Sequence, residues 1–240
     1  LVEHLDRDLP LDADVLAFRG KWGRHRAKVD TDLGLVERGD VTTENWPAFV
    51  GHVEFVRDGR RVFETLLAKG GTSAVVASAL HTMRDSLPMG LFHPLLKHAL
   101  AVAPPAPGLI ADALSYMAIR YANLLHEPVV IEGSRSVPPS EAWRRIAAGE
   151  TVLPEVPYGG ALRVCEQLVG NELLQRAALA PDIDLSIPEI CGLALRLYLH
   201  EPALTTLHAV TSAQALAQLT TDRALWARYF IWLTALFVAK

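Results

Sequence analysis

Apolar residues recur at the spacing of a helix face along nearly the whole chain, and hardly any segment alternates for long enough to predict a strand. This spacing gathers the apolar side chains of each segment on one side of a helix, so the sequence predicts an almost entirely α-helical protein. The chain has 240 residues, of which half are hydrophobic, and is long enough to bury most of its unfolded surface. We therefore expect an all-α fold: one large multi-helix domain over residues 1–240, with a buried pocket.

Prolines, glycines and capping residues set the expected ends of these helices. Helices are expected from about 47 to 69, over 72–86, 90–102 and 108–125, from Ser140 through Trp143, around Cys165 and Glu166, after 186 as far as His200, and over 203–219 and 222–239. Residues 1–45 are irregular, and 128–139 could hold a short strand or a lid loop.

Three helix starts carry specific predictions. Pro94 is expected in the first turn of its helix, because proline has no N–H to lose there, and this places His93 at or beside the N-cap. Ser140 is expected to cap the short helix that follows it. The sequence "SIPE" at 186–189 matches a capping box, in which the serine and glutamate side chains bond to each other's end of the first turn.

Charge and composition exclude several classes of function. The net charge of −4 and the single short basic cluster at 21–28 do not indicate nucleic-acid binding. The longest apolar stretch, at 229–239, has about half the length of a membrane span, and the start of the chain does not resemble a secretion signal. We therefore expect a cytoplasmic protein that binds no membrane. Cys165 and Cys191 lack metal-binding spacing and are expected to be reduced and buried.

Two of the nine histidines, His93 and His208, lie within otherwise apolar helical segments. A buried imidazole needs a partner for its ring nitrogens, which can be a metal ion, a backbone carbonyl or a hydroxyl. Lys97 follows His93 by one turn, and Thr211 and Ser212 follow His208 within about one turn. The other histidines have ordinary structural explanations, among them His25 in the basic cluster, His52 and His81 on amphipathic helices, and His126 and His200 at helix ends.

No GxGxxG, Walker, GxSxG or HExxH motif is present, so the sequence does not support a nucleotide-loop, serine-hydrolase or zincin mechanism. Three ordered segments instead resemble the questin oxidase-like family. "GLFHPLLKHALAV" followed by "IADALSYMA" is similar to the family's "FHPLIRLGYA…AEALAYWA", and "TLHAVTSAQALAQL" is similar to "LLHAVTGTHALRLL". The segment "ALWARYFIWLTALFVA" resembles the helix that follows it, "ALRRFWQALAAAYVA". The resemblance covers roughly residues 46–125 and 187–240.

The resemblance implies an all-helical oxygenase that cleaves aromatic or quinone-type small molecules by Baeyer–Villiger-like or iron-dependent ring opening. It implies dioxygen as a co-substrate, NADPH as the reductant, and a histidine-bound non-haem iron that a modified lysine completes in part of the family. Matched residue by residue, His93 is the histidine of the "FHPL" motif and His208 is that of the "LHAVT" motif. These two residues are the predicted metal ligands.

The chain departs from the family pattern at both ends. We find no counterpart of the family's "NHLPMAL" helix, and the His-x-x-Lys segment that follows the "LHAVT" helix in the family is missing here. Two imidazoles alone hold iron weakly, so further ligands are expected, and His4, His52 and His98 are the nearest in sequence. The alternatives are a helical protein that binds a small molecule without catalysis, and a helical interaction scaffold.

Overall fold

We describe the protein from a computed structural model. The structure describes Thr42, Asn45, Trp46 and the ranges 55–84, 92–120, 137–150, 161–180 and 182–240. Within these ranges the helices are α3 (Phe55–Gly70), α4 (Thr72–Thr82), α5 (Phe92–Ala101), α6 (Pro107–Arg120), α7 (Pro139–Ala147), α8 (Ala161–Val169), α9 (Glu172–Ala178), α10 (Ile187–His200), α11 (Leu204–Leu219) and α12 (Arg223–Val238).

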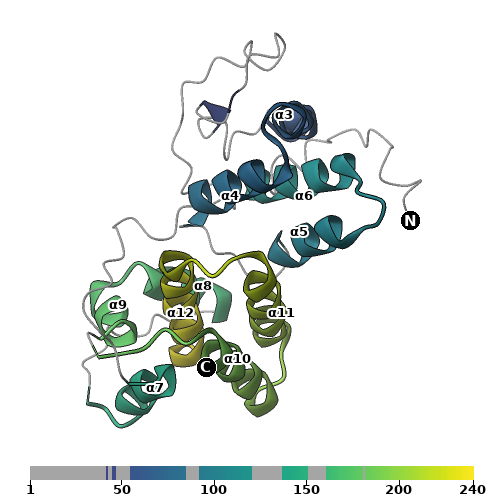
Figure 1. The fold of residues 1–240 in the computed structure, drawn as a ribbon. Helices are drawn as coiled ribbons and strands as arrows, with labels where there is room; N and C mark the ends of the chain where they lie inside the picture. The colour runs from purple at the N-terminus through teal and green to yellow at the C-terminus, as the bar shows by residue number, and fades with distance from the viewer. Residues whose placement is uncertain are drawn as a thin grey trace.

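The helices form two groups, with α3 to α6 above and α7 to α12 below in Figure 1. Each group surrounds its own cluster of buried apolar side chains. The two groups meet where α5 packs on α11 and where Leu225, near the start of α12, enters the upper cluster. The described ranges contain no strand, only an isolated parallel bridge between Val137 and Ile183. The prediction of an all-α fold is confirmed for the part of the chain that the structure describes.

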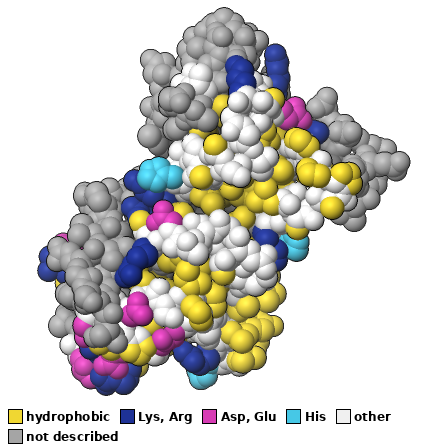
Figure 2. Space-filling model, in the orientation of Figure 1, with side chains coloured by type: hydrophobic (Ala, Val, Ile, Leu, Met, Phe, Trp, Pro, Cys, Tyr) yellow, Lys and Arg dark blue, Asp and Glu magenta, His cyan; other side chains and the backbone are white. Residues whose placement is uncertain are grey.

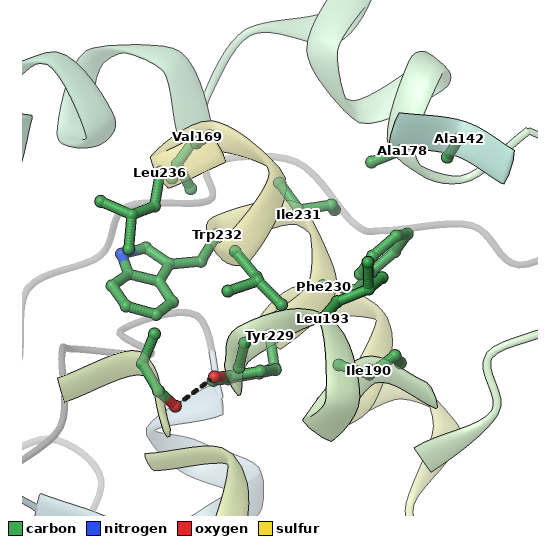
Figure 3. Packing of buried hydrophobic residues seen from close by; sticks show 14 of the residues in the cluster. Ala142, Val169, Ala178, Ile190, Leu193, Tyr229, Phe230, Ile231, Trp232 and Leu236 are labelled. Carbon is green, nitrogen blue, oxygen red and sulfur yellow. Dashed lines mark hydrogen bonds between the residues drawn. The ribbon is translucent and has the colours of Figure 1, made fainter. Parts of the chain in front are cut away.

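Helix α12 is the centre of the lower group. Asp222 caps its first turn, where Oδ1 accepts hydrogen bonds from the backbone N–H groups of Ala224 at 2.7 Å and Leu225 at 3.4 Å. Every residue from Leu225 to Leu236 is buried, because α8, α9, α10 and α11 surround the helix. Figure 3 shows Tyr229, Phe230, Ile231 and Trp232 projecting from it in different directions into the cluster.

The upper group is built on the contact of α3 with α6. The ring of Trp46 meets Phe63 of α3 edge to face, with 5.2 Å between the ring centroids. Its indole N–H donates to the Ser78 hydroxyl of α4 at 3.2 Å. Leu96 of α5 and Leu114 of α6 complete the centre of this cluster, where neither is exposed. The cluster thus holds α5 in place, and α5 carries one of the two predicted site histidines.

The predicted capping box at 186–189 is wrong, because Glu189 bonds to a different helix. Ser186 is the N-cap residue of α10, but its side chain makes no capping hydrogen bond. The Glu189 carboxylate instead accepts from the Ser140 hydroxyl at 2.5 Å and from the Ser140 backbone N–H at 3.1 Å. Ser140 is therefore not the N-cap of α7, which is Pro138. Glu189 on α10 thus accepts hydrogen bonds from the first turn of α7, and this contact joins the two helices.

Most helix ends agree with the expected bounds. The helices that end at Gly70, His200 and Leu219 do so within a residue or two of the prediction, which is the usual uncertainty of such limits. Helix α9 was not foreseen as a separate element, although Asn171 caps it in the usual way by accepting from Leu173 and Leu174. The expected helix start at about 47 lies outside the described residues, as does segment 1–41.

Both cysteines have free thiols, as the lack of paired spacing predicts. Cys165 is buried, whereas Cys191 is partly exposed, so the expectation of burial is confirmed for Cys165 alone. Among the described helices, none is both long enough and apolar enough to cross a membrane.

A buried polar pair ties α7 to α12. The indole N–H of Trp143 donates to the Thr234 hydroxyl at 3.1 Å, and neither side chain is more than 7% exposed. We expect Thr234→Val to lower the free energy of unfolding by about 1–3 kcal/mol, because it leaves the indole N–H buried without an acceptor. Urea denaturation measures the loss. Thr205→Val on α11 is the matched control, since Thr205 is partly exposed and its hydroxyl makes no hydrogen bond to the described residues. Equal losses in the two variants would contradict the role of the pair.

Candidate functional site

The two helices that carry the predicted ligands pack against each other. Helix α5 carries His93 and α11 carries His208, and the contact between these helices joins the upper and lower groups. The ammonium group of Lys97 on α5 donates a hydrogen bond to the side-chain oxygen of Gln214 on α11 at 2.7 Å. The prediction that the two motif helices lie together is confirmed.

Lys97 shows which side of α5 faces α11. Its side chain is partly buried and reaches Gln214, while Leu96 and Ala99 point into the upper cluster. His93 precedes Lys97 by four residues, so its Cα lies one turn earlier on the same side of the helix. The side chain of His93 lies outside what the structure describes. Pro94 is in the first turn of α5 as predicted. His93 is the second residue of the helix, so it lies neither at the N-cap nor directly beside it.

On α11, a row of small residues allows close packing. Ala209, Ser212 and Ala213 are buried, and the phenol of Tyr229 donates to the backbone carbonyl of Ala209 at 2.6 Å, the dashed line in Figure 3. The start of the helix is held by Thr206, whose hydroxyl accepts from the Ala203 N–H at 3.1 Å. His208 therefore lies on a helix that the Tyr229–Ala209 hydrogen bond joins to α12.

His208 itself is partly buried. Its backbone carbonyl accepts from the Thr211 hydroxyl at 3.2 Å, so Thr211 is bonded to the helix backbone. Within the described residues, no side chain forms a hydrogen bond with the His208 imidazole. The ring is therefore available to a ligand as far as the described part of the chain is concerned.

The described residues do not make up an iron centre. No group of three or more His, Cys, Asp or Glu side chains lies together within them, and iron sites in proteins use at least that many ligands. Of the further candidates, His98 is exposed on α5, and His4 and His52 lie outside the described residues. The ligand assignment of His93 and His208 stays a prediction.

A cleft of about 310 Å³ lies beside the junction and opens to solvent. Helix α4 forms one wall, Leu100 of α5 contributes, and the turn between α11 and α12 forms the other wall. On the face shown in Figure 2, apolar side chains gather on both sides of the waist between the upper and lower helices. The cleft therefore lies between the upper group and the end of α11.

Two residues of this cleft, His81 and Asp222, belong to no motif of the sequence. His81 is exposed near the end of α4 and was interpreted as part of an amphipathic face. Asp222 could have been identified as a helix start, because an aspartate before an apolar run is a typical N-cap. Its position opposite α4 depends on the packing of the two helix groups, which local sequence patterns do not reveal.

No family model matches this chain, and neither a curated protein nor a solved structure does.

Proposed function

We propose that this chain is a questin oxidase-like oxygenase that acts on an aromatic or quinone-type small molecule at the junction of α5 and α11. The observation that supports the proposal is the direct packing of the two helices with the "FHPL" and "LHAVT" motifs. These segments are more than a hundred residues apart in sequence, and the Lys97–Gln214 hydrogen bond joins them. Motifs that belong to one site have to meet in this way.

The proposed reaction inserts one oxygen atom of dioxygen into the C–C bond beside a ring carbonyl. NADPH supplies the two electrons as a hydride and becomes NADP⁺, and the other oxygen atom takes up this hydrogen and one proton from solvent and leaves as water. The residues of this chain would bind and orient the ring: α5 offers the Lys97 ammonium at its contact with α11, and α11 carries the partly buried His208 imidazole. Because the described residues do not complete an iron site, we assign no step to iron and keep the metal as a separate question.

Iron binding tests the ligand assignment. The protein, purified without an affinity tag, is incubated with ferrous iron in the absence of oxygen, and the iron that remains after gel filtration is counted. We expect little iron in the native chain unless further ligands complete the site. We expect His93→Ala and His208→Ala each to weaken binding by roughly tenfold or more, because each removes one ligand bond.

His98→Ala is the matched control for this experiment, because His98 lies on α5 and its side chain is exposed. Iron binding is expected to be unchanged in this variant. Iron that persists in both His93→Ala and His208→Ala would contradict the assignment of these two residues. Tight stoichiometric iron that both variants lose would show a complete site within the chain.

Oxygen consumption tests the activity itself. With NADPH and a hydroxylated anthraquinone as probe, we expect consumption of one dioxygen for each NADPH oxidised and a ring-opened product that is heavier by one oxygen atom. Binding of the probe with no oxygen consumption, with or without added ferrous iron, would support the alternative, a helical protein that binds a small molecule without catalysis.

A further inference from the structure

The cleft beside the junction has the size of a small-molecule site. Its volume of about 310 Å³ lies at the lower end of the range for ligand pockets, roughly 300–1,000 Å³. Aliphatic side chains from α4, α5, α11 and α12 line the cleft: Val76, Ala77, Leu80, Leu100, Leu219 and Leu225. A molecule bound there would contact both helix groups.

The rim of the cleft carries hydroxyl groups, an imidazole and one carboxylate, from Thr72, Ser73, Thr220, His81 and Asp222. Most of these groups already have partners. The Thr220 hydroxyl accepts from the Asp222 N–H at 3.0 Å, and Nε2 of His81 accepts from the guanidinium of Arg84 at 2.6 Å. Their bonds hold the rim in shape and leave less capacity for a ligand.

Asp222 has spare capacity. Its Oδ1 atom accepts both capping hydrogen bonds of α12, and within the described residues no donor reaches its Oδ2 atom. An ionised carboxylate only accepts hydrogen bonds. The ligand that this rim recognises therefore carries a donor.

We propose that the cleft binds a neutral, largely apolar small molecule with one N–H or O–H group, which donates to the free carboxylate oxygen of Asp222. The aliphatic lining favours an apolar ligand, because apolar surface gains free energy when it leaves water. The Asp222 carboxylate disfavours an anion. This proposal goes beyond the oxygenase function, because it involves neither His93 nor His208 and requires no reaction.

N-phenyl-1-naphthylamine is a suitable probe, because it is neutral, has one N–H group, and fluoresces strongly only in an apolar environment. We expect saturable binding of one molecule per chain. Ala77→Trp fills the cleft from an exposed position of α4 and is expected to weaken binding roughly tenfold or more, because the probe and the new ring occupy the same space. Ala147→Trp, at an exposed position at the end of α7, is the matched control and is expected to bind like the native chain.

Asp222→Asn tests the polar contact. Asparagine also caps helices, but its one carbonyl oxygen has to face the N–H groups of Ala224 and Leu225, which leaves an NH₂ group toward the ligand. We expect the affinity for the probe to fall roughly threefold to tenfold, the value of one hydrogen bond. The N-methylated probe, which has no donor, is expected to bind the native and Asp222→Asn proteins equally.

Two results would overturn the proposal. Unchanged affinity in Ala77→Trp would show that the probe binds elsewhere, for example on exposed leucines such as Leu199 and Leu204. Unchanged affinity in Asp222→Asn would remove the recognition of a donor. Neither titration uses oxygen, NADPH or metal, so its outcome is independent of the oxygenase proposal.

Discussion

Replacing Leu193 by alanine is expected to lower the free energy of unfolding by about 2–5 kcal/mol, the cost of a cavity in a packed core. Leu193 is 3% exposed and packs in the lower cluster beside Phe230 (Figure 3). The neighbouring elements α11 and α12 are held by other contacts and cannot fully close the gap. Chemical denaturation with a two-state fit measures the loss.

Leu199→Ala is the matched control, because Leu199 belongs to the same helix and is 67% exposed. We expect this variant to change the free energy of unfolding by no more than about 0.5 kcal/mol. The two variants remove the same atoms from α10 and alter helix propensity equally, so their difference isolates burial. A loss in Leu199→Ala as large as that in Leu193→Ala would mean that an additional contact covers Leu199.

Tyr229→Phe is expected to reverse the sign of its effect between neutral and alkaline pH. At neutral pH the variant loses the hydrogen bond from the phenol to Ala209 and is expected to be less stable by about 0.5–1.5 kcal/mol. Burial raises the pKa of the Tyr229 phenol well above its ordinary value, and the nearby Cys191 thiol adds to the rise. In the unfolded chain the phenol ionises near pH 10.

A group with a raised pKa in the folded state contributes stability below its unfolded pKa and loses it as the pH rises toward the folded pKa. Above about pH 10 the native protein should therefore lose about 1.4 kcal/mol per pH unit more than Tyr229→Phe does. Urea denaturation from pH 7 to pH 11 would show the two stability curves crossing. Parallel curves over this range would mean that Tyr229 ionises as readily in the folded protein as in the unfolded chain.

Helical periodicity predicted the elements well, because most of them bury one face and expose the other. Helix α10 is an example, since Leu193 and Leu197 face the core while Leu195 and Leu199 face solvent. Local patterns failed where a side chain serves a distant element. Glu189 has the position of a capping-box residue in its own helix, yet it bonds to Ser140, forty-nine residues earlier in the chain.

The candidate site shows the same limit. The two histidine motifs of the sequence lie on α5 and α11, and these two helices pack together. Lys97 follows His93 by one turn in the sequence, but its partner Gln214 lies 117 residues away. The cleft could not be foreseen from periodicity, because Leu100, Leu219 and Leu225 come together only when the two helix groups dock. That His93 and His208 meet at the junction stays a prediction.

The complete burial of α12 from Leu225 to Leu236 has a consequence for how this protein can vary. A helix with a solvent face accepts substitutions on that face, so variable positions recur every three or four residues along its sequence. Helix α12 has no such face over that stretch, so it is expected to accept only substitutions that conserve side-chain volume and polarity. In a comparison of diverged relatives, this segment would stand out as a continuous block of restrained change, while α10 would show the alternating pattern of a surface helix.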